Sequence, residues 1–96
     1  MPYIKKHARK LYDSDIESLL FKLEAQYREN GSEPSTLIDG DVNYIITRIV
    51  AGIYAKGGYS CQSRGHECFN AAMQEYYRRV MVPHEILKIQ ENGDAY

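Results

Sequence analysis

The chain has 96 residues, twelve of them Lys or Arg and thirteen Asp or Glu, so its formal net charge is −1. This balance provides no overall attraction for phosphate backbones or anionic lipid, which disfavours a general nucleic-acid binder. No apolar run approaches the roughly 20 residues needed to cross a bilayer, so no membrane span is expected. The length predicts one domain over residues 1–96 with a thin margin of stability, because so short a chain buries only roughly 60 to 65% of its unfolded surface.

The first predicted helix covers residues 14–29. Ser14 and Glu17 predict a capping box at its start, and Asn30 followed by Gly31 predicts its end. Pro34 then marks a loop. Phe21 lies off the apolar stripe by roughly 140°, so we expect it to be exposed in a lone monomer. The stripe itself follows the spacing of one helix face and consists of Ile16, Leu19, Leu20, Leu23 and Tyr27.

The second predicted helix begins near Asp39 or Asp41, either of which can cap it, and ends at Gly57 and Gly58. Its β-branched content makes a strand the competing interpretation, but the helical period and the length favour a helix. Its apolar face spans about half the cylinder, so we expect this helix to form the centre of the core. The face consists of Val42, Ile45, Ile46, Ile49 and Ile53, widened by Val50 and Tyr54.

A third helix is predicted from Ser60 or Ser63 to Val82, where Pro83 breaks or kinks it because proline cannot donate to the helix ladder. A short fourth helix follows over residues 84–91 and stops at Asn92 and Gly93. The predicted fold is therefore all-α, a compact bundle of three main helices plus a short C-terminal helix after Pro83. The inner face of the third helix would consist of Cys61, Cys68, Phe69, Ala72, Met73, Tyr76 and Val80.

Four stretches of the sequence occur together in the same order in a known family. They are MPYI at residues 1–4, GDVNYIITRI at 40–49, YRRV at 77–80 and ENGDAY at 91–96. With them the chain resembles an uncharacterised family of short bacterial and phage proteins, classed as a domain of unknown function. The chain departs from the family pattern at residues 57–67 and after Pro83. The resemblance implies a phage or mobile-genome setting, and it implies no activity and no binding residue.

The best candidate metal ligands are Cys61, His66 and Cys68, since zinc prefers thiolate and imidazole. Their spacing matches no standard zinc motif and a fourth ligand is missing, so we favour buried, reduced cysteines on the inner helix face and expect no metal. Two cysteines and no secretory leader predict a reducing, cytoplasmic location.

No motif predicts catalysis. His7, His66 and His84 are scattered, and no serine or cysteine stands in a nucleophile elbow. There is no P-loop, no glycine-rich dinucleotide motif and no metalloprotease helix motif. We therefore expect a protein that is not an enzyme, with no catalytic residue and no cofactor.

Candidate binding residues lie on the second helix, where Tyr44 and Arg48 are one turn apart on one flank of the apolar face. Tyr44 could stack on a ligand while Arg48 grips an anion, or Tyr44 could simply pack on the Arg48 stem. Asn43 and Thr47, on another flank, are expected to make buried hydrogen bonds to a neighbouring helix.

A second candidate pair is Tyr77 with Arg78 on the third helix. Aromatic rings beside guanidinium groups suit a nucleotide's base and phosphates, or an acidic patch of a partner. Glu75 and Arg79 are predicted to form a structural ion pair, whereas Arg78 is predicted to point outward with less to hold it.

The sequence predicts a small non-catalytic, phage-associated binding protein that binds or sequesters a small anionic, nucleotide-type ligand such as a host immune signal. The alternative is a protein-interaction module or inhibitor that docks on a host protein, since nine tyrosines suit an interface. A DNA-binding regulator ranks third because of the charge balance. The broad apolar face and the exposed Phe21 further predict a homo-oligomer whose interface completes the core.

Overall fold

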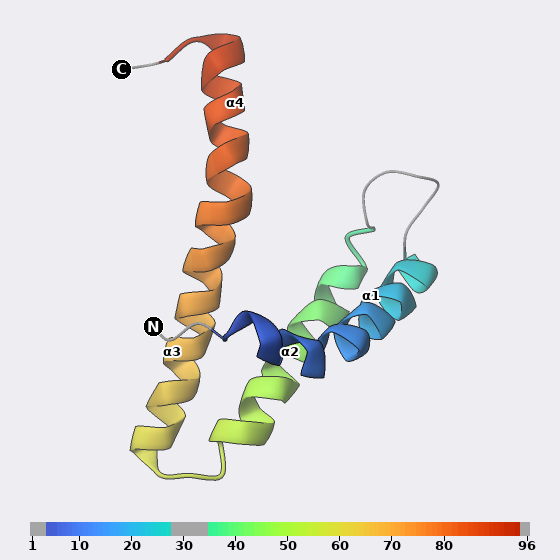
Figure 1. Cartoon of the computed structure of the whole chain (residues 1–96), viewed down its shortest axis with the longest axis vertical. Helices are drawn as coiled ribbons and strands as arrows, with labels where there is room; N and C mark the ends of the chain where they lie inside the picture. The colour runs from blue at the N-terminus through green and yellow to red at the C-terminus, as the bar shows by residue number, and fades with distance from the viewer. Residues whose placement is uncertain (1–3, 28–34, 95–96) are drawn as a thin grey trace. The chain divides into compact units, whose positions relative to one another are not determined.

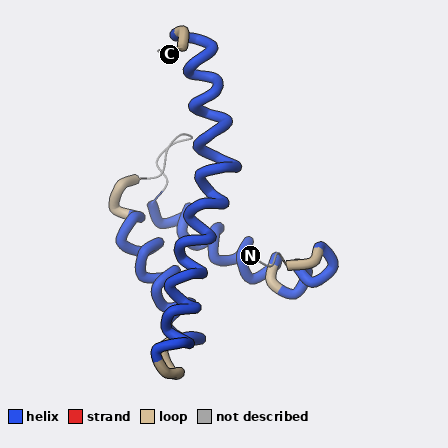
Figure 2. The backbone as a smooth tube through the Cα atoms, turned by 90° about the vertical axis from the view of Figure 1, so that its left-hand side faces the viewer, coloured by secondary structure: helices blue, strands red, loops and turns tan. Residues whose placement is uncertain are grey.

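The computed structural model describes residues 4–27 and 35–94, and within these ranges all regular structure is helical (Figures 1 and 2). The predicted all-α class is therefore confirmed, with three main helices and a C-terminal one. The chain divides into two units, Met1–Thr47 and Arg48–Tyr96, with the boundary inside the second main helix. The elements are the 3-10 helix η1 (Lys6–Leu11), α1 (Asp13–Tyr27), α2 (Ile38–Tyr54), α3 (Tyr59–Tyr76), the π-helical segment η2 (Tyr77–Met81) and α4 (Val82–Asn92).

The first unit begins with η1, which the sequence pattern did not predict, and continues into α1. The amide of Ile16 donates to the carbonyl of Tyr12 at 2.9 Å, so Tyr12 is the residue before the first turn. Ser14 lies inside that turn, and the predicted capping box is therefore wrong. The predicted end at Asn30 and Gly31, and the loop with Pro34, lie outside the described residues.

The start of α2 is held by Ser35 and not by an aspartate. Its hydroxyl oxygen accepts from the amide of Leu37 at 3.3 Å, and its carbonyl accepts from the amide of Ile38 at 3.1 Å. Asp39 and Asp41 lie within the first turn, so the predicted aspartate cap is wrong. Their carboxylates still stabilise the helix there, because they meet the positive end of its dipole.

In the second unit, residues 48–54 of α2 turn back into α3 through residues 55–58 (Figure 1). The two helices approach closely at Gly65, which is buried. A Cβ at this position would lie 2.9 Å from Cβ of Tyr54 and 3.2 Å from Cγ1 of Val50. Glycine is therefore required at this contact by space and not by backbone conformation.

The turn between α2 and α3 is closed by a side chain from α3. The amide group of Gln62 donates to the carbonyl of Gly57 at 3.3 Å and lies 3.5 Å from that of Ala55. These carbonyls follow the end of α2, where a helix leaves its last carbonyls without partners. Gln62 thus fixes the direction in which the chain leaves α2.

Pro83 does not interrupt the helical backbone. The segments α3, η2 and α4 follow one another as one continuous helical ribbon in Figure 1. The amide of Val82 donates to the carbonyl of Tyr77, five residues back, which is the π-helical pattern. The wider turn occurs directly before Pro83, whose missing N–H and ring would disturb a regular ladder. The predicted break at Pro83 is therefore a π bulge, and α4 ends as predicted, at Asn92 with Gly93 at φ 85°.

The predicted core on α2 is wrong for the single chain. Ile46, Ile49 and Ile53 are exposed, Ile49 by 57%, and among residues 4–27 and 35–94 the buried large apolar residue is Ile38, at 8%. The reason is that α2 packs on α1 alone in the first unit and on α3 alone in the second. One neighbouring helix cannot cover an apolar face that spans half the cylinder. Phe21 is 75% exposed, as predicted for a single chain.

Replacing Gly65 by Ala is expected to destabilise the chain by about 1 to 3 kcal/mol, because the new methyl group overpacks the contact with Tyr54 and Val50. The matched control is Gly52→Ala on α2, where a Cβ meets nothing within 4 Å. The control is expected to raise stability by about 0.5 to 1 kcal/mol, through helix propensity alone. Urea unfolding followed by circular dichroism measures both changes, and equal stabilisation by the two variants would contradict the close approach.

Candidate functional site

A pocket of about 250 Å³ lies in the first unit, between α1 and α2. Three apolar side chains, Leu19, Leu23 and Ile45, form most of its wall, and all three are half-buried. The remaining lining side chains carry polar or charged groups. They are Lys22, Gln26, Asp41 and Tyr44.

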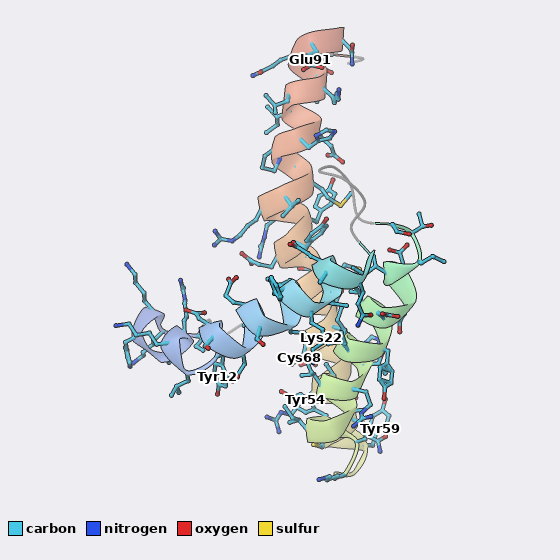
Figure 3. The ribbon with its side chains drawn as sticks, turned by 90° about the vertical axis from the view of Figure 1, so that its right-hand side faces the viewer. Tyr12, Lys22, Tyr54, Tyr59, Cys68 and Glu91 are labelled. Atoms are coloured by element: carbon cyan, nitrogen blue, oxygen red, sulfur yellow. The ribbon has the colours of Figure 1, made fainter. Side chains whose placement is uncertain are left out.

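The chemistry of this pocket combines one flat aromatic side chain with one charge of each sign. Tyr44 is 56% exposed and offers a ring face with a polar end. Lys22, labelled in Figure 3, supplies an ammonium group from α1. Asp41 is half-buried and can accept hydrogen bonds with its carboxylate. Such an apolar wall with a few converging polar groups is typical of a small-molecule site.

Of the residues that line this pocket, Tyr44 was predicted from the sequence to bind a ligand, whereas Lys22 and Gln26 were not. The signal was present in the spacing, since Leu19, Lys22, Leu23 and Gln26 recur at i, i+3, i+4 and i+7 on one helix face. The apolar periodicity of this helix includes Leu19 and Leu23 and leaves out Lys22 and Gln26. It therefore assigned this face of α1 to a core that the single chain does not form.

The predicted pair of Tyr44 and Arg48 falls on either side of the boundary between the units, since Thr47 ends the first and Arg48 begins the second. The neighbouring polar pair is bonded within α2, where the hydroxyl of Thr47 donates to Oδ1 of Asn43 at 3.2 Å. Both residues are exposed. The prediction of buried hydrogen bonds from these residues to a neighbouring helix is therefore wrong.

The second predicted pair, Tyr77 with Arg78, lies in η2 on consecutive residues. The hydroxyl of Tyr77 donates to Oε2 of Glu85 at 3.3 Å. Arg78 is bound to Oε2 of Glu75 at 2.6 Å, and Nε of Arg79 donates to Oε1 of the same carboxylate. The predicted ion pair of Glu75 with Arg79 is confirmed, but the prediction that little holds Arg78 is wrong, because the i, i+3 spacing also brings it to Glu75.

A third cluster lies at the contact of α2 with α3 in the second unit. The thiol of Cys68 donates to the hydroxyl of Tyr54 at 3.3 Å, and both residues are labelled in Figure 3. The guanidinium carbon of Arg64 lies 5.6 Å from the centroid of the Tyr54 ring. A pocket of about 230 Å³ beside this cluster is lined by Val50, Ala51, Tyr54, Ala55, Gln62, Gly65, His66 and Phe69.

The hydrogen bond with Cys68 raises the pKa of Tyr54 above its usual value of 10.0, and the charge of Cys68 and burial act in the same direction. A negative charge at Cys68 would accept a hydrogen bond from the Tyr54 hydroxyl and would repel the negative charge of a Tyr54 phenolate. The cation of Arg64 opposes this effect. The neutral phenol is therefore favoured in the folded chain.

Cys61 and Cys68 are both free thiols and half-buried, which agrees with their predicted place on the inner face of the helix. In the described part of the chain, His, Cys, Asp and Glu side chains form no group of three that could hold a metal ion. Cys68 is engaged with Tyr54, and Cys61 lies against Gly57. The contacts of both cysteines are thus those of packing.

The comparisons with known proteins assign the chain to a family. Residues 1–95 match the family described as Domain of unknown function (DUF6899), and the chain belongs to it. No curated protein and no solved structure matches the chain. Among the helices of the described residues, none has the length and apolar character needed to span a membrane.

Replacing Cys68 by Ala is expected to lower the pKa of Tyr54 toward 10.0, because the largest cause of the upward shift is removed. The measurement is a titration of phenolate absorbance, with Tyr54→Phe subtracted to isolate this residue. The pKa of Tyr54 in the folded chain lies above its value of 10.0 in the unfolded chain. The contribution of Tyr54 to the free energy of unfolding is therefore complete below pH 10, and it is lost as the pH rises through the folded-state pKa. An unchanged titration curve in the Cys68 variant would contradict this cause.

Proposed function

We propose that the chain is a small, non-catalytic binding protein whose first unit binds a small anionic ligand of the nucleotide type. The observation that carries this proposal is the pocket that brings Tyr44 and Lys22 together against an apolar wall. A base can stack on the tyrosine ring, and an ammonium group attracts a phosphate. Asp41 and Gln26 offer hydrogen-bonding partners for ring nitrogens or sugar hydroxyls.

The size of the pocket limits the ligand. At about 250 Å³ it lies near the lower end of the range of small-molecule sites, roughly 300 Å³. It suits a group of about the size of one nucleoside, with phosphates at the open side near Lys22. Arg48, Tyr77 and Arg78 do not line this pocket and belong to the second unit, where they stay separate predicted binding residues. Arg78 shares the carboxylate of Glu75 with Arg79.

The proposed setting is a phage or mobile genome, which follows from the family resemblance. In that setting a binding protein can act by sequestering a nucleotide-type signal of host immunity. Such a task requires affinity and slow release and requires no bond to be broken or made. A binding pocket without a catalytic motif suits this task.

Tyr44→Ala and Lys22→Ala are each expected to weaken ligand binding by roughly tenfold or more, which corresponds to the loss of one stacking or charge contact. A panel of mononucleotides and cyclic nucleotides, screened by thermal shift and followed by calorimetry, measures the affinity. Tyr59→Ala and Lys56→Ala, on exposed residues of the second unit, are the matched controls and should bind normally. No rise in melting temperature with any nucleotide would contradict the proposal.

A protein-interaction module or inhibitor that docks on a host protein is the second candidate, favoured by a different observation. Large apolar side chains are exposed along all four α-helices, including Phe21, Ile49, Met73 and Leu87. Exposed apolar surface of this extent is typical of contact surfaces between chains. We propose that part of it is covered by copies of the same chain, so that the working form is a homo-oligomer.

Self-association is expected to persist in reducing agent and EDTA, because apolar surface and not a disulfide or metal is proposed to drive it. Light scattering over micromolar concentrations measures the mass. A plain monomer throughout this range would contradict the oligomer, and loss of association in reducing agent alone would assign it to Cys61 or Cys68.

A further inference from the structure

Lys22 and Asp41 line the same pocket of about 250 Å³ in the first unit, with an ammonium group on α1 and a carboxylate on α2. In the described ranges 4–27 and 35–94, neither side chain takes part in an ion pair or a hydrogen bond. Both charged groups are therefore available to a ligand. A single ligand can use both of them if it offers an anion at one end and hydrogen-bond donors at the other.

The place of Asp41 on α2 determines which part of a nucleotide it meets. Asp41 and Tyr44 are one turn apart, so the carboxylate lies beside the ring on the same helix face. Asp41 is half-buried, whereas Lys22 is exposed. A base held against the apolar wall and Tyr44 therefore turns an edge toward Asp41, while the phosphates stay at the open side with Lys22. The opposite orientation is disfavoured, because the carboxylate repels a phosphate.

An ionised carboxylate accepts hydrogen bonds and donates none, so it selects a base edge that carries donors. Among the common bases, guanine alone has two adjacent N–H donors on one edge, at N1 and N2, and these match the two carboxylate oxygens. Adenine and cytosine have an acceptor beside the amino group, and uracil has its donor between two acceptors. We infer that the ligand is a guanine nucleotide whose base edge binds Asp41 and whose phosphates bind Lys22. This inference rests on the proposed function and adds to it the identity of the base.

Two ligands that differ in one amino group test the recognition of guanine. GMP should bind roughly tenfold more tightly than IMP, which lacks the 2-amino group, and AMP should bind no more tightly than IMP. Calorimetry on the full chain measures the three dissociation constants. An affinity for IMP or AMP equal to that for GMP, or above it, would overturn this inference and leave the proposed nucleotide binding standing. No binding of the three nucleotides or of their cyclic forms would overturn both.

Asp41→Asn tests the residue, because it replaces one acceptor oxygen by an NH₂ donor at nearly constant size. The preference for GMP over IMP should fall from roughly tenfold to about one. Asp39→Asn is the matched control, since Asp39 lies in the same first turn of α2 and does not line the pocket. Both variants remove a carboxylate from the positive end of the helix dipole, so a loss of stability is common to them and the preference alone separates them. A preference that survives in Asp41→Asn, or disappears in Asp39→Asn, would overturn the role of Asp41.

Discussion

The apolar face of α2 is broader than the part of it that α1 and α3 cover. The exposure of its remaining apolar side chains follows from this difference. In the first unit, Ile45 lies in the wall shared with α1, and in the second unit Val50 and Tyr54 meet α3 at Gly65. The side chains between these contacts, such as Ile49, are exposed. A helix is stabilised mainly by burial of its apolar face. The proposed oligomer follows from this requirement.

The close approach of α2 and α3 at Gly65 positions the side chains around it. Without a side chain at this position, α3 comes near enough for the thiol of Cys68 to reach the hydroxyl of Tyr54. The same contact places Arg64 over the Tyr54 ring. The raised pKa of Tyr54 is a consequence of this packing, because its largest cause is the hydrogen bond with Cys68.

The pocket on which the proposed ligand binding rests lies in the first unit. The proposed binding depends on Tyr44 and Lys22, where an aromatic face and a cation adjoin an apolar wall.

The sequence by itself determined the helical class, the helix positions and several local contacts, because these depend on neighbours three or four residues away. The exposed position of Phe21, the ion pair of Glu75 with Arg79 and the end of α4 at Gly93 are of this kind. Only the tertiary structure decided that Ile49 is exposed, that Lys22 adjoins Tyr44 and that Gly65 is a contact point. Periodicity identifies an apolar face, but it contains no information on whether another helix covers that face. The π bulge allows the helix to continue past Pro83, which lacks an N–H and whose ring crowds the preceding turn. A sequence pattern shows the proline but does not show that the helix continues past it.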